Sequence, residues 1–254
     1  MTDPEALHDV AVRAGPWQLV AAAATAQGPV RRENQDAFRL VPVPEVGLGL
    51  VLADGMGGHS GGGEAAVAAV AAAAERLAAP DAGEVRLREA VSLANAAVAG
   101  VRLRLGGNPG TTMIAAEIRD GRLLLAHAGD SRAYLLRGGA AIQLTADHSV
   151  TGERVRDGTL DPEVARHDPR RNYVTRALLG DPVEPDISAT SLAAGDVVVL
   201  CSDGLWEPLT DADIARLAGG AAPPGAAAPR LVEAALDAGS TDNVTAVVAR
   251  LDLR

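Results

Sequence analysis

The chain contains no lysine, because all 23 of its basic residues are arginine. This excludes chemistry that depends on a lysine, including the Walker phosphate loop, a pyridoxal Schiff base and the usual kinase lysine. Cysteine is almost as scarce. Cys201 is the single cysteine and cannot form an internal disulfide, which favours a reducing compartment.

Basic residues are fewer than acidic ones, and long apolar runs are missing. The 23 basic residues face 33 acidic ones, and the resulting charge of -10 would repel a phosphate backbone. The longest uncharged apolar run, around 65–74, is well short of the ~20 residues that span a bilayer. The apolar stretch 17–26 follows an acidic leader, the wrong sign for a signal peptide. We expect a soluble, cytoplasmic protein that binds neither nucleic acid nor membrane.

The apolar residues that are present are enough for one sizeable core, since they make up 48% of 254 residues. Short apolar runs bounded by Gly, Asp or Asn predict strands at 17–25, 47–53, 111–118, 122–128, 133–136, 196–201 and 243–251. Apolar residues spaced by three and four predict a helix at 85–105, and further helices are expected at 64–79, 211–218 and 228–237. Hairpins between paired helices predict antiparallel sheets covered by helices.

Several strongly apolar runs end in a carboxylate beside a glycine. Asp54 and Gly55 follow one run, Asp130 and Asp203 follow two others, and Asp242 stands just before the last predicted strand. A single Asp-Gly after a strand is typical of a turn. Four such carboxylates that converge would repel one another and raise their pKa values unless cations neutralised them. Oxygen ligands without a Cys or His cluster favour Mg²⁺ or Mn²⁺ over Zn²⁺.

Such a site can act on phosphorus without a protein nucleophile. Two ions about 3.5–4 Å apart would lower the pKa of a bridging water and present hydroxide for in-line attack. A cationic side chain is also needed to bind the phosphoryl oxygens, and the planar fork of arginine suits that task. Arg31 is the candidate.

The order of the motifs resembles the PPM family of metal-dependent serine/threonine protein phosphatases, its bacterial branch in particular. The matching segments are 28–36, 53–64, 110–112, 129–135, 172–180, 202–205 and 242–245. The resemblance implies an α+β fold, an αββα sandwich of two antiparallel β-sheets flanked by helix pairs. It also implies a single domain at 17–254 after an N-terminal extension at 1–16, with a flap subdomain at about 145–179 near the metals.

The resemblance also implies roles for individual residues. Asp54 would bridge two ions, with the carbonyl of Gly55 completing one of them. Asp203 and Asp242 would hold the other ion, Asp130 a third and weaker one, and Asp36 would support the site directly or through water. Arg31 would grip the phosphate, while Thr111 and Thr112 would pack near the site. The implied substrates are phosphoserine and phosphothreonine proteins, and the implied partner is a bacterial Ser/Thr protein kinase.

Three positions depart from the family pattern. Gln35 stands where many members have Glu, which removes a charge near one metal. Met56 replaces a His proposed as general acid in the animal branch, and that role is not transferred to His59. The loop at 60–64 is one residue longer than usual, and its glycines are expected to absorb the difference.

Other functions remain alternatives. Gly58 to Gly62 match a G-x-S-x-G elbow, so a serine esterase with Ser60 as nucleophile is a rival, although no late histidine follows His167. A catalytically silent PPM-fold regulatory module is another, but its signature would be a lost metal carboxylate, and all five are present. The remaining histidines are taken as ordinary core or surface residues, except that His148 and His167 are candidates for substrate contact in the flap.

Overall fold

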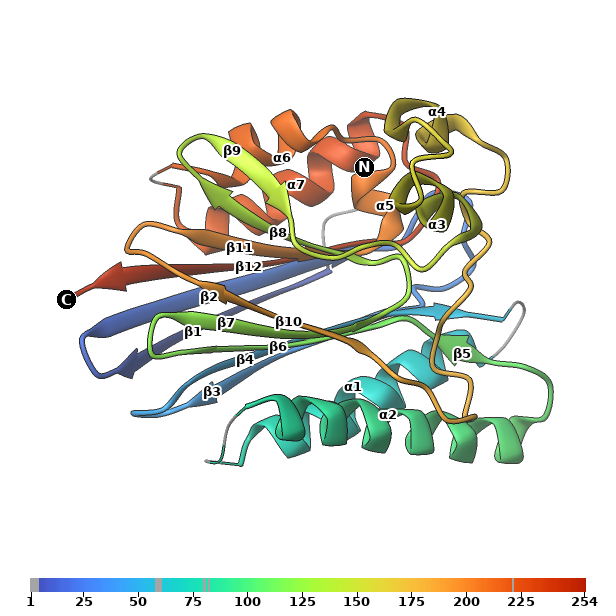
Figure 1. The fold of residues 1–254 in the computed structure, drawn as a ribbon, viewed down its shortest axis with the longest axis horizontal. Helices are drawn as coiled ribbons and strands as arrows, with labels where there is room; N and C mark the ends of the chain where they lie inside the picture. Colours follow the sequence, from blue (N-terminus) through green and yellow to red (C-terminus); the bar gives the residue numbers. More distant parts are fainter. Residues whose placement is uncertain (1–4, 58–60, 80, 82, 221) are drawn as a thin grey trace.

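The computed structural model describes residues 5–57, 61–79, 81, 83–220 and 222–254, with side chains from residue 9 onward. Within the described residues, two six-stranded antiparallel sheets pack face to face, and helices cover both outer sides (Figure 1). The predicted αββα sandwich is therefore confirmed.

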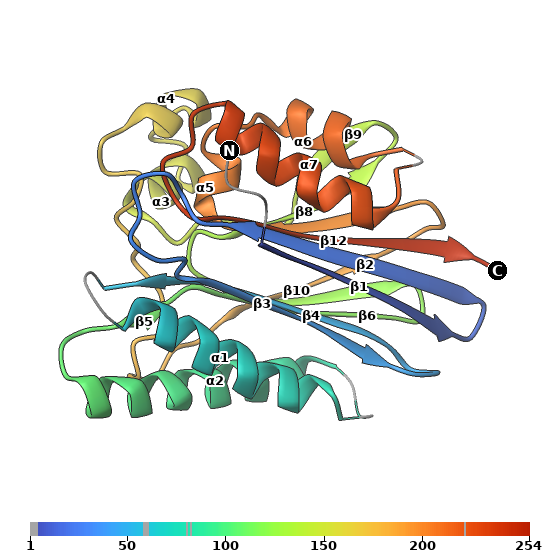
Figure 2. The ribbon, with the colours of Figure 1, turned by 180° about the vertical axis from the view of Figure 1, so that it is seen from behind.

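The first sheet has the strand order β1-β2-β12-β11-β8-β9. Its strands are β1 (Glu5–Ala14), β2 (Trp17–Ala26), β12 (Val244–Leu253), β11 (Val197–Cys201), β8 (Arg132–Arg137) and β9 (Ala140–Gln143). The helices α6 (Asp211–Ala218) and α7 (Pro224–Asp237) cover its outer face, and the one-turn α5 (Asp203–Trp206) follows β11 (Figure 2).

The second sheet has the order β10-β7-β6-β4-β3, with β5 paired to the end of β4. Its strands are β10 (Asp186–Ser191), β7 (Arg122–Ala128), β6 (Met113–Arg119), β4 (Gly47–Met56), β3 (Asp36–Val43) and β5 (Gly110–Thr111). The helices α1 (Gly62–Leu77) and α2 (Glu84–Leu105) lie against its outer face (Figure 1). Within the described residues, no helix is long and apolar enough to cross a membrane.

The core has three layers because the central strands are buried on both faces. In β4, Leu50 and Leu52 face the layer between the sheets, while Val51 and Ala53 face α1 and α2. Strands buried in this way read as nearly continuous apolar runs in the sequence. In β2, the alanines on the outer side pack against α7, where small side chains let the helix come close.

The N-terminal segment, predicted to be an extension at 1–16, contains the first strand of the structure. Strand β1 pairs antiparallel with β2 along most of its length, and Val12 and Ala14 are buried. A single glycine turn at Gly15, with a φ of 56°, joins the two strands. The segment therefore forms the edge of the first sheet, and the domain boundary at residue 17 stays a prediction.

The segment between β9 and β10 contains two short helices, α3 (Val150–Arg156) and α4 (Pro162–His167), on the side of the sandwich where α5 lies (Figure 1). Ser149 begins α3 by accepting a hydrogen bond from the Gly152 amide at 3.1 Å, and Asp161 begins α4 in the same manner. This is the region predicted at 145–179 to be a flap. The end of this region is held against β5 by an isolated bridge, since the backbones of Leu178 and Thr111 exchange two hydrogen bonds.

Candidate metal centre

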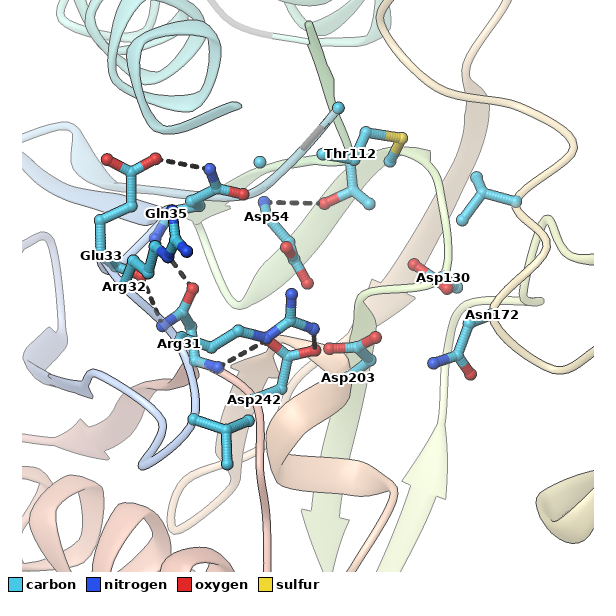
Figure 3. A pocket seen from close by; sticks show the side chains of 16 residues that line it. Arg31, Arg32, Glu33, Gln35, Asp54, Thr112, Asp130, Asn172, Asp203 and Asp242 are labelled. Carbon is cyan, nitrogen blue, oxygen red and sulfur yellow. Dashed lines mark hydrogen bonds and ion pairs between the residues drawn. The ribbon is translucent and has the colours of Figure 1, made fainter. Parts of the chain in front are cut away.

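The predicted carboxylates gather at one end of the sandwich, around an open cavity of about 640 Å³. Figure 3 shows Asp54, Asp130, Asp203 and Asp242 with their side chains directed into the same space. Each comes from a different strand end, as the sequence predicted: β4, the β7–β8 turn, the start of α5 and the segment before β12. The cavity is lined by Val30, Arg31, Arg32, Glu33, Gln35, Asp54, Gly55, Met56, Gly57, Thr112, Asp130, Asn172, Val174, Asp203, Asp242 and Asn243.

The backbone of Asp54 is fixed by two threonines. The Asp54 amide donates to Thr112 Oγ1 at 2.9 Å, and the Asp54 carbonyl accepts from Thr111 Oγ1 and from the Thr112 amide, both at 2.9 Å. The two threonines, expected to pack near the site, therefore hold the chain that carries its central carboxylate. Gly55 is required next to it, because a Cβ there would lie 2.3 Å from the carbonyl oxygen of Gly62.

Asp36 lies opposite Asp54, since the two are register partners on β3 and β4. Its Oδ2 accepts hydrogen bonds from Ser202 Oγ at 2.7 Å and Thr245 Oγ1 at 2.6 Å, whereas its Oδ1 is buried with no hydrogen-bond partner. Burial raises the pKa of Asp36 to about 6, an effect that the two hydroxyl donors reduce and the charge of Asp242 increases.

The other carboxylates are perturbed in the same direction. Burial raises the pKa of Asp54 and of Asp203 well above the ordinary value, and the neighbouring carboxylates raise both further. Burial, with the nearby charge of Asp147, raises the pKa of Asp130 to about 7. The crowding inferred from the sequence is therefore present, and it favours protonation unless a cation shares the site.

Arg31 forms an ion pair with the Asp242 carboxylate, and about half of its side chain is exposed to solvent (49%). This ion pair could not be predicted from the sequence, because it joins residues 211 positions apart. Gly28, at the start of the same loop, packs against the Asp242 backbone so closely that a Cβ would lie 2.2 Å from its carbonyl oxygen. The loop that contains Arg31 therefore packs directly against the segment that contains Asp242.

The donor set fits a hard divalent cation. No cysteine or histidine is among the described residues that line the cavity. Asp36 Oδ1 and Asp203 Oδ1 are both buried without a hydrogen-bond partner, as expected for oxygens that a cation would satisfy. In the described part of the chain, no three His, Cys, Asp or Glu side chains meet at one point. Mg²⁺ and similar ions are commonly held by one or two carboxylates and several waters, which suits carboxylates spread around an open cavity.

Several functional neighbours were not singled out from the sequence. Asn243 Oδ1 accepts from the Gln35 amide at 2.9 Å, so it ties the Arg31 loop to the segment before β12. Asn172 and Val174, from the predicted flap, form part of the cavity wall. His148, a candidate for substrate contact, is instead buried. Ser60, the nucleophile of the esterase alternative, and His59 lie outside the described residues.

Comparison with known proteins identifies the class. Residues 73–244 match the family model described as protein phosphatase 2C. The serine/threonine protein phosphatase PstP of Mycobacterium tuberculosis is 40% identical over 238 residues, which cover 90% of this chain and 44% of PstP. The serine/threonine phosphatase stp of Listeria monocytogenes is 31% identical over 90% of this chain and 94% of its own length. The chain thus spans less than half the length of the mycobacterial relative.

Solved structures agree with this class. A crystal structure of the M. tuberculosis phosphatase PstP has a TM-score of 0.83 at 38% identity, covering 92% of this chain and 99% of that one. A catalytic domain of PstP in complex with two manganese ions has a TM-score of 0.82 at 36% identity, covering 93% and 99%. The chain belongs to the protein phosphatase 2C, or PPM, family, as the order of its motifs predicted.

Proposed function

We propose that this protein is a Mn²⁺- or Mg²⁺-dependent phosphatase of phosphoserine and phosphothreonine in proteins. The observation that carries this proposal is that the carboxylates of Asp54, Asp130, Asp203 and Asp242 line one cavity together with Arg31. Asp36 lies beside them, as the register partner of Asp54 on β3. The family relatives of the protein are named as serine/threonine phosphatases, and one was solved with two manganese ions.

The carboxylates would hold the ions. Asp54, Asp203 and Asp242, with the carbonyl of Gly55, are the proposed ligands of two ions, Asp130 of a third, and Asp36 supports the group. The ions, when bound, supply a water of lowered pKa as the nucleophile. The threonines that fix the Asp54 backbone keep its carboxylate in place, so little reorganisation is needed when substrate arrives.

Arg31 is the proposed phosphate-binding residue. Its guanidinium lies at the rim of the cavity, is half exposed and pairs with a carboxylate in the absence of substrate. A phosphoryl group that enters the cavity would offer it two oxygens in place of Asp242, and a guanidinium binds two such oxygens with parallel hydrogen bonds. Positive charge there would also offset the carboxylates, which otherwise repel a phosphate dianion.

The reaction class is consistent with an open, polar site. No cysteine lines the cavity, and Cys201 is fully buried with its thiol pKa raised by that burial, so it cannot act as a nucleophile. The substrates must be phosphorylated by a Ser/Thr protein kinase, which makes such a kinase the proposed partner. A cytoplasmic location, supported by the lone reduced cysteine, completes the proposal.

The test compares three substrates. Phosphate release from a phosphothreonine peptide and from a phosphotyrosine peptide of the same sequence is measured in Mn²⁺ and in EDTA. Alcohol release from a carboxylic ester is measured under the same two conditions. We expect release from the phosphothreonine peptide in Mn²⁺ only. Ester hydrolysis in EDTA that Ser60→Ala abolishes would overturn the proposal in favour of the esterase. A folded protein that binds Mn²⁺ and hydrolyses none of the three would support the catalytically silent module.

A further inference from the structure

The turn that carries Asp130 is held by a buried histidine from the opposite segment. The amide of Gly129 donates to His148 Nδ1 at 3.1 Å, and the amide of His148 donates to the Gly129 carbonyl at 2.8 Å. His148 is only 1% exposed. Both polar groups of the glycine before Asp130 are therefore bonded to one residue that lies 19 positions away.

The ring of His148 is fixed on its other sides as well. Because Nδ1 accepts a hydrogen bond from an amide, it carries no proton, and the proton lies on Nε2. Nε2 is 3.0 Å from Asp186 Oδ2 on β10, to which it donates. The imidazole of His127 stacks on the ring, with centroids 4.7 Å apart. Burial also lowers the pKa of His148, which agrees with a neutral ring.

The turn between β7 and β8 has little freedom of its own. Gly129 has a φ of 127°, and a Cβ there would lie 2.5 Å from the Cβ of Thr112, the residue that fixes Asp54. On the far side, Trp206 Nε1 donates to the Asp130 carbonyl at 3.0 Å. His148 and Trp206 thus form hydrogen bonds with the main chain on either side of the Asp130 side chain. The position of the Asp130 carboxylate relative to Asp54 therefore depends on both residues.

His148 also joins the turn to the wall of the cavity. Its carbonyl accepts a hydrogen bond from the Thr175 amide at 2.8 Å, and the next residue, Ser149, forms an isolated bridge with Val174. Val174 lines the cavity. The side chain of His148 therefore contacts the Asp130 turn, while its backbone is bonded to a segment that forms part of the cavity wall.

We propose that His148 is a positioning residue, which places the Asp130 carboxylate for cation binding through the Gly129 amide. This role rests on the proposed function, because it requires Asp130 to hold an ion. Groups that orient a metal ligand from behind change metal affinity by about 10–100-fold when they are removed. We therefore expect loss of the His148 acceptor to weaken the weakest cation site selectively.

Two isosteric variants separate this role from simple packing. His148→Asn places an amide oxygen near the position of Nδ1, so it can still accept from Gly129. His148→Gln places its amide near the position of Nε2, so it retains the contact with Asp186 but not the acceptor for Gly129. Gln18→Ala is the control, because Gln18 is exposed and lies at the end of β2 remote from Asp242.

Two readouts do not depend on turnover. Calorimetric titration with Mn²⁺ measures each cation site, and the amide resonance of Gly129 in the metal-free protein reports its hydrogen bond. We expect His148→Gln to raise the dissociation constant of the weakest site at least ~10-fold and to shift the Gly129 resonance. His148→Asn should stay within about 3-fold of the wild type, and the control should match it.

The outcomes distinguish the two levels of the proposal. A folded His148→Gln protein with wild-type affinity at every Mn²⁺ site would overturn the positioning role while leaving the proposed function intact. Equal losses in His148→Asn and His148→Gln would also overturn it, since they would indicate packing alone. A wild-type protein that binds no Mn²⁺ would overturn the proposed function, and the role of His148 with it.

Discussion

Asp36→Asn should stabilise the metal-free protein at neutral pH and not at acid pH. The carboxylate is buried, and only one of its oxygens is hydrogen-bonded, to Ser202 and Thr245. An asparagine can accept the same two hydrogen bonds through its carbonyl oxygen. The substitution removes only the negative charge of the carboxylate. Burial of that charge is unfavourable when no cation is present.

The magnitude follows from the pKa. In the folded protein burial raises the pKa of Asp36 to about 6, against 3.8 for the ordinary group. Because the folded value is the higher one, the stability linked to this group is present below pH 3.8 and is lost as the pH rises to about 6. At 1.36 kcal/mol per pKa unit, the full loss is about 3 kcal/mol. The asparagine has no such loss, so its advantage should be about 3 kcal/mol at pH 7.5 and below about 1 kcal/mol at pH 4.

Urea unfolding of both proteins without metal, at pH 4 and at pH 7.5, measures this difference. Comparing the two proteins at the same pH cancels the titration of groups on which the charge of Asp36 has no effect, such as His127, whose pKa burial lowers. Added Mn²⁺ should reverse the order at pH 7.5, since the wild type gains a ligand-linked stabilisation that the asparagine weakens. A free-energy difference that does not change between the two pH values would show that the buried charge of Asp36 does not destabilise the metal-free protein.

Three further changes test other parts of the structure. Arg86→Met leaves the Glu117 carboxylate, which is 2.7 Å from Arg86 and 3% exposed, as an uncompensated buried charge. The substitution should lower the free energy of unfolding in urea by about 3–5 kcal/mol. Adding Glu117→Leu should recover most of that loss. A loss below about 1 kcal/mol would count against the pair. Arg31→Ala should lower kcat/KM for a phosphopeptide at least ~10-fold through the lost charged hydrogen bonds, and an unchanged value would remove it from the substrate site. Gly28→Ala forces the loop away from the Asp242 carbonyl and should weaken Mn²⁺ binding in calorimetry, whereas unchanged binding would show that the loop can shift freely.

The fold was predictable where strands are buried on both faces. The apolar runs at 47–53 and 196–201 became β4 and β11, and the helix periodicity at 85–105 became α2. Strands β3, β9 and β10 were not predicted, because their side chains are partly exposed and mix polar with apolar types. Such edge strands are defined by the neighbour they pair with, which a single sequence does not show.

The site was predictable in its residue types and not in its contacts. A carboxylate beside a glycine at the end of an apolar strand marks Asp54 and Asp203 in the sequence, and the sandwich brings these strand ends together. The hydrogen bonds from Ser202 and Thr245 to Asp36, in contrast, join three distant segments. His148 stands in a polar segment that reads as exposed, and only the tertiary structure buries it behind the Asp130 turn.

In the proposed function, Asp54 anchors a divalent-cation site at which phosphoproteins are hydrolysed. The most direct measurement is phosphate release from a phosphothreonine peptide by the wild type and by Asp54→Asn, each in Mn²⁺ and in EDTA. Asp237→Asn, at an exposed carboxylate at the end of α7, is the matched control. We predict release in Mn²⁺ only, an Asp54→Asn rate at least ~100-fold lower, and a control equal to the wild type. Wild-type turnover that persists in EDTA, or in a folded Asp54→Asn protein, would contradict the claim.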